Sequence, residues 1–179
     1  MNVAVDIYVA IFLSGILLAA IICDIWVAKI PNVITFPGML IGVIYHGASQ
    51  GLSGVWLSIA GLLVGGGVFL PFYLLKGMGA GDIKLMGAVG ALVGLKAVIP
   101  AIVFTALAGG VYAFALIFFN PRTCKRLIFG SVSMLKTFVL TGQLFLPALF
   151  EKEKKPQVRY GIAIAAGTIF SQWWWPLLK

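Results

Sequence analysis

The sequence predicts a polytopic α-helical membrane protein. Of its 179 residues, 61% are hydrophobic and only 10% are charged. A water-soluble domain of this size does not bury that much apolar surface, so the lipid bilayer has to act as the solvent. The apolar residues form long unbroken runs, whereas a membrane β-barrel would show alternating segments of about ten residues. We therefore expect an all-α fold, with one integral membrane domain over residues 1–179.

Six apolar segments are long enough, with their flanks, to cross the bilayer as helices. Another apolar stretch, residues 127–150, is interrupted by Lys136, Gly142, Gln143 and Pro147. We expect it to be an interfacial or re-entrant helix on the cytoplasmic side. The predicted spans cover residues 7–23, 33–45, 55–75, 82–93, 97–119 and 160–175.

The net charge of +8 reflects membrane topology and does not indicate nucleic-acid binding. With six spans and both termini outside, eleven of the thirteen basic residues fall on the cytoplasmic side, opposite only Lys96 and Lys179. Cytoplasmic loops of membrane proteins carry this excess of lysine and arginine, which also attracts anionic lipid. A seventh span would place Lys152, Lys154 and Lys155 on the wrong side.

Small residues mark the predicted helix contacts. Gly61 and Gly65 are four residues apart in the third span, and Gly87, Gly90 and Gly94 line the fourth. In lipid, apolar surface alone does not drive helices together, and glycines allow close approach of two backbones. We expect tight packing at these positions.

Two of the five acidic residues, Asp24 and Asp82, lie at the edges of apolar spans. Acids at such positions are functional candidates because the bilayer disfavours each by at least a few kcal/mol. Asp24 closes the first span, where the helix dipole disfavours a negative charge and no structural benefit is evident. The predicted topology places both acids at the cytoplasmic face.

Asp82 follows two spaced glycines, Gly79 and Gly81, at the start of the fourth span. Glycines permit positive φ and the close approach of another backbone. The structural alternative is that Asp82 simply caps the helix N-terminus. Nearby Lys84 could pair with Asp82 or with a lipid phosphate.

Two close carboxylates do not both ionise easily, so one holds a proton while the other activates water. Such a pair hydrolyses a peptide bond with neither a metal nor a covalent nucleophile. Histidine, cysteine and glutamate do not cluster in the sequence, so we expect no metal site and no cofactor. The single histidine, His46, is expected to be a packed or interfacial residue.

The surroundings of both acids resemble the type IV prepilin peptidases. Asp24 followed by Lys29-Ile30-Pro31-Asn32 resembles their first signature, and Gly79-Ala80-Gly81-Asp82-Ile83-Lys84 resembles their second, of GxGD type. Residues 160–167 resemble their C-terminal helix motif. The three matches occur in the right order over nearly the whole chain.

The resemblance implies an aspartyl endopeptidase of the bacterial inner membrane that removes the leader of type IV prepilins at the cytoplasmic face. Its substrates would have a basic leader, a glycine before the scissile bond and an apolar helix after it. Larger members carry an N-terminal CxxC domain and N-methylate the new terminus. This sequence lacks CxxC and resembles the short tight-adherence (Flp) type, for which no methyltransferase activity is implied. Asp24 and Asp82 would be catalytic, and the loop-shaping or substrate-binding residues would be Gly79, Gly81, Lys84, Pro31 and Asn32.

Two other functions remain open from the residues alone. A small transporter or channel would also contain intramembrane acids, but at mid-bilayer and with internal repeats. A catalytically silent subunit of a pilus or secretion machine would tolerate loss of either acid. Both acids are present here, at helix ends, which favours the peptidase.

Overall fold

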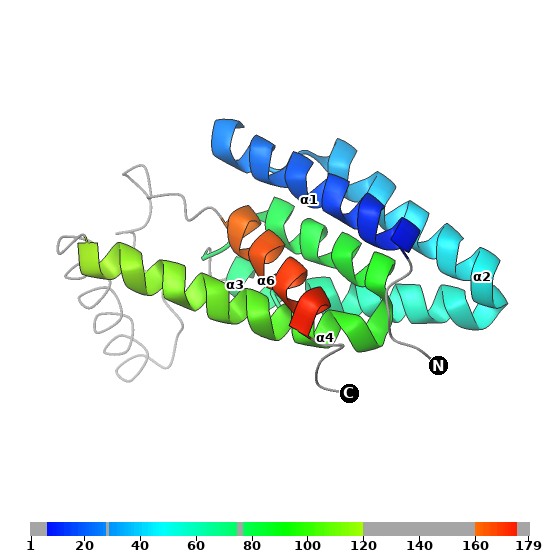
Figure 1. The fold of residues 1–179 in the computed structure, drawn as a ribbon. Coiled ribbons are helices and arrows are strands. Elements are labelled where there is room, and N and C mark those ends of the chain that lie inside the picture. The colour runs from blue at the N-terminus through cyan, green and yellow to red at the C-terminus, as the bar shows by residue number, and fades with distance from the viewer. Residues whose placement is uncertain (1–6, 28, 75–76, 120–159, 175–179) are drawn as a thin grey trace, which may run out of the picture. The chain divides into compact units, whose positions relative to one another are not determined.

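A computed structural model describes residues 7–27, 29–74, 77–119 and 160–174, and these segments contain helices and no strands (Figure 1). The predicted all-α membrane fold is confirmed. The described residues up to Gly109 form one compact unit with the C-terminal helix, and the described residues 110–119 belong to a second. The predicted interfacial helix over residues 127–150 lies outside the described residues. The helices are α1 (Ile7–Val27), α2 (Asn32–Gly67), α3 (Leu70–Leu74), α4 (Ala80–Phe119) and α6 (Tyr160–Trp174).

Three described stretches are long and apolar enough to cross a membrane: Ile7–Val27, Asn32–Leu74 and Ala80–Tyr112. The 21 residues of α1 extend about 31 Å, close to the thickness of the hydrocarbon core. The 43 residues from Asn32 to Leu74 are far more than one crossing needs. The exact number of crossings stays a prediction.

Both long helices reverse direction at a glycine with positive φ, Gly51 in α2 (63°) and Gly94 in α4 (77°). Residues other than glycine rarely adopt this conformation. A Cβ added to Gly54 would collide with the carbonyl of His46, eight residues earlier, although a straight helix would separate them by about 12 Å. Figure 1 shows each helix doubling back on itself.

The reversals explain how the predicted spans relate to the observed helices. Residues 33–45 and 55–75 were expected as separate spans, and both contribute to α2, on either side of Gly51. Residues 82–93 and 97–119 likewise belong to the two legs of α4 around Gly94. The third predicted span, residues 55–75, includes the end of α2 at Gly67 and the short α3 that follows it.

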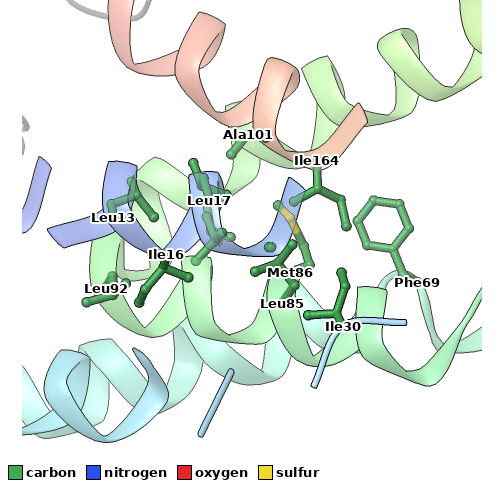
Figure 2. Packing of buried hydrophobic residues seen from close by; sticks show 14 of the residues in the cluster. Leu13, Ile16, Leu17, Ile30, Phe69, Leu85, Met86, Leu92, Ala101 and Ile164 are labelled. Carbon is green, nitrogen blue, oxygen red and sulfur yellow. The ribbon is translucent and has the colours of Figure 1, made fainter. Parts of the chain in front are cut away.

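The first leg of α4 is the centre of the bundle. All eight residues from 85 to 92 are buried, so this leg is covered on every side. Figure 2 shows Leu85 and Met86 of this leg packed near Leu17 of α1, Ile164 of α6 and Ile30. Side chains from four separate parts of the chain therefore meet around one short helical segment.

Glycines bring the backbones of α2 and α4 into contact. A Cβ added to Gly61 would collide with the carbonyl of Gly90, and one added to Gly65 would lie 2.5 Å from the carbonyl oxygen of Met86. A Cβ added to Gly42, on the other leg of α2, would lie 2.6 Å from the carbonyl of Ala91. The close packing predicted for these spans is confirmed.

Side chains of α2 bind the carbonyls that the break in α4 leaves without helical partners. The Ser58 hydroxyl donates to the Ala91 carbonyl (2.8 Å), and His46 Nε2 donates to the Leu92 carbonyl (3.0 Å). Backbone groups at a helix end need such partners, above all where water is excluded. His46 is buried, which confirms the expectation of a packed histidine.

The Gly61 contact predicts that Gly61→Ala destabilises the protein. The added methyl group meets backbone atoms, which cannot move aside, so α2 and α4 must separate; overpacking of this kind costs about 1–3 kcal/mol. Thermal unfolding of the purified protein in detergent should show a melting temperature several degrees lower. Gly67→Ala in the same helix is the control, because no atom lies within 4 Å of the added methyl group. Equal melting temperatures for the two variants would contradict this packing.

Candidate active site

Asp24 lies in the last turn of α1 and is only 6% exposed. Its Oδ2 accepts a hydrogen bond of 3.1 Å from the backbone N–H of Gly161, the second residue of α6. The first N–H groups of a helix have no partner within the helix, and the dipole there favours negative charge. The interpretation that the position of Asp24 brings no structural benefit was wrong, because a second helix compensates the unfavourable end of its own.

Asp82 is the third residue of α4 and is 8% exposed. Its Oδ2 accepts a hydrogen bond of 3.1 Å from the Gly79 N–H, while its own N–H donates to the Gly79 carbonyl (3.2 Å). The residue before the helix is therefore Gly79, and Asp82 reaches back to it from the first turn, as the acid of a capping box does. The simple N-cap alternative for Asp82 is corrected accordingly.

Gly79 and Gly81 do not have the positive φ that glycine permits. Glycine fits at these two positions because neighbouring atoms leave little room for a side chain. A Cβ added to Gly81 would lie 3.0 Å from both the Cβ and the carbonyl oxygen of Ile30. A Cβ added to Gly79 would lie 3.0 Å from Oδ2 of Asp82. The start of α4 thus rests directly on the segment that joins α1 to α2, with its carboxylate against Gly79.

Lys84 connects the same two parts of the chain. Its Nζ donates a hydrogen bond of 2.9 Å to Oδ1 of Asn32, the first residue of α2, and lies 5.4 Å from the centre of the Phe36 ring. The sequence suggested Asp82 or a lipid as partners, and did not suggest Asn32. Pro31 precedes α2 in an extended conformation that directs Asn32 into the helix. The residues of the two signatures are therefore in direct contact.

The two carboxylates are close enough that the charge of Asp24 acts on Asp82, and Asp82 in turn acts on the Tyr160 side chain. Three helix ends meet here: the end of α1, the start of α4 and the start of α6. Chemically, the arrangement provides two buried acids, each oriented by one backbone N–H. Within the described segments, no three histidine, cysteine or acidic side chains come together as a metal site would require.

Sequence reasoning missed the contacts of three residues: Ile30, Tyr160 and Gly161. Each lies inside a stretch that resembled a family signature, so its presence was noted but its role was not. The apolar side chain of Ile30 and the small size of Gly161 were the signals that the sequence offered. The sequence does not show what these two residues contact, because the partner of Ile30 is Gly81, 51 positions away, and the partner of Gly161 is Asp24, 137 positions away.

Comparison with known proteins shows the family of the chain. Residues 11–114 match the model of the type IV leader peptidase family. A prepilin leader peptidase/N-methyltransferase of Xanthomonas campestris pv. campestris is 32% identical over 119 residues, which are 63% of this chain and 42% of that protein. The chain thus spans less than half the length of this relative. No solved structure matches. Because the family match covers more than half of the chain, including both buried aspartates, the protein belongs to the type IV leader peptidase family.

Proposed function

We propose that this protein is a membrane-embedded aspartyl endopeptidase that removes the leader peptide of type IV prepilins of the Flp kind. The observation that carries the proposal is the pair of buried carboxylates, Asp24 and Asp82, close enough to interact and each held by a backbone N–H. Family membership and the name of the Xanthomonas relative support a prepilin as the substrate. The proposal is limited to peptide cleavage and does not include N-methylation.

The reaction needs one shared proton and one water molecule. One aspartate accepts a proton from the water molecule while the water oxygen attacks the scissile carbonyl carbon. The other aspartate donates a proton to the leaving nitrogen as the C–N bond breaks. Because the two acids interact, they titrate as a unit, and the base is not assigned to either residue. No cofactor or metal takes part in this scheme.

The substrate class follows from the resemblance: a basic leader, a glycine before the scissile bond, and an apolar helix that lies in the membrane. Cleavage would occur at the cytoplasmic face of the bacterial inner membrane, with both termini of the peptidase outside. The remaining partners are membrane lipids, with no role for nucleic acid. We place the peptidase activity in one integral membrane domain over residues 1–179.

Removing either carboxylate should stop processing. In Asp24→Asn and Asp82→Asn, the amide oxygen can still accept the hydrogen bond from Gly161 or Gly79, but the side chain no longer exchanges a proton. We expect a loss of at least about 10³-fold in the rate of leader removal. The rate is measured by gel shift of a Flp-type precursor co-expressed in membranes, with Asp6→Asn as the matched control. Wild-type processing by either variant would exclude the dyad.

The topology can be tested by labelling with a membrane-impermeant maleimide. In a Cys23→Ser, Cys124→Ser background, Lys96→Cys should react in intact spheroplasts, because Lys96 is predicted outside. Lys154→Cys should react only after the membrane is permeabilised, because eleven of the thirteen basic residues are predicted on the cytoplasmic side. Labelling of Lys154→Cys in intact spheroplasts would refute the six-span topology and the shared face of the two acids.

The Lys84–Asn32 hydrogen bond should hold the two signature segments together. Lys84→Met and Asn32→Ala each remove the bond, so the double variant should lose little more stability than either single variant. The coupling energy expected for such a contact is at the low end of about 0.5–3 kcal/mol, because the pair is exposed. Thermal unfolding of the four proteins measures it, and Lys96→Met in the same helix serves as the control. Strictly additive losses would show that the two residues are not coupled.

A further inference from the structure

We infer that Gly161 is a positioning residue, whose backbone holds the Asp24 carboxylate in the orientation in which it works with Asp82. This inference rests on the proposed peptidase function. It assigns a task to the first turn of α6, which the pair of acids alone does not explain.

The contact between Gly161 and Asp24 is made by the backbone and leaves no room for a side chain. The Gly161 N–H donates to Oδ2 of Asp24 at 3.1 Å. A Cβ added to Gly161 would lie 2.8 Å from the same oxygen and 3.2 Å from both Cβ and Cγ of Asp24. The Asp24 side chain is therefore packed against this glycine as well as bonded to it. Any larger residue must displace either the carboxylate or the helix.

The residue next to Gly161 lies within the electrostatic influence of the other acid. Asp82 acts on the Tyr160 side chain, while the Gly161 N–H bonds to Asp24. The first turn of α6 therefore lies beside both members of the pair and bonds directly to Asp24.

The rest of α6 is packed against the core and against α4, which restricts movement of its first turn. Ile164 and Ala165 are buried in the core, and Gly167 lies against the backbone of Thr105 in α4. The rings of Phe104 and Phe170 pack edge to face, with centres 4.9 Å apart. A side chain added at Gly161 will consequently move the carboxylate more readily than the helix.

Steady-state cleavage of a Flp-type precursor by the purified full-length protein tests this role. In Gly161→Ala, kcat should fall about 100-fold, as expected for a misplacement of about 1 Å, while KM changes less than threefold. The matched control is Gly109→Ala, whose added methyl group makes only ordinary contacts of 3.7 and 3.9 Å with the Tyr160 ring. The control should keep the wild-type kcat. If Gly161→Ala also keeps it, the inference is wrong.

A stability cycle tests the contact without using activity. Gly161→Ala should lower the melting temperature of the wild type more than that of Asp24→Ala, where the contacts of the added methyl group with Oδ2 and Cγ are gone and only the one with Cβ remains. An equal decrease in both backgrounds would overturn the inference. The two hypotheses fail differently: a wild type that cleaves no precursor refutes the peptidase, whereas an active wild type with a fully active Gly161→Ala refutes only the positioning role.

Discussion

The structure depends on keeping two carboxyl groups inside an apolar bundle. Asp24 and Asp82 are both almost fully buried, and an isolated carboxylate in such surroundings is strongly disfavoured. Each is stabilised by one backbone N–H, from the start of α6 and from the start of α4. A helix N-terminus favours a nearby negative charge, because its first N–H groups have no partner within the helix. Both acids are thus bonded to backbone groups at the start of a helix.

Backbone contacts fix the position of these helix ends. The first leg of α4 is buried on all sides, and glycines of α2 touch its backbone directly. At its far end, His46 and Ser58 bind the carbonyls that precede the break at Gly94. At its near end, Gly81 rests on Ile30, and Lys84 bonds to Asn32. With both ends of this leg attached to α2 or to the segment before it, Asp82 has a defined place in the bundle.

The sequence was sufficient for the features that depend on composition and on local pattern. The all-α membrane class followed from the apolar content, and the close approach of Gly61 followed from its spacing to Gly65. The reversals at Gly51 and Gly94 lie between segments that the sequence predicts as separate spans. Charge placement predicted one face for Asp24 and Asp82, and the structure brings them close enough to interact.

Features that depend on distant partners were not predictable. Nothing local in Asp24 indicates that α6 will bind it, so its place at the end of α1 appeared to lack a structural benefit. Asp82 looked like an N-cap because the start of α4 could not be located to within two residues. The sequence suggested two partners for Lys84, Asp82 and a lipid phosphate, and only the folded chain shows that it binds Asn32.

The separation of Asp24 from Gly161 also has a consequence for biosynthesis. The two residues are 137 positions apart, and ribosomes add about 5–20 residues per second. Roughly 7–27 s therefore pass between synthesis of the first acid and synthesis of the backbone amide that orients it. During that interval α1, α2 and most of α4 can already be in the membrane, yet the carboxylate still lacks this hydrogen bond. The nascent chain thus acquires its complete site only when its last helix has been made.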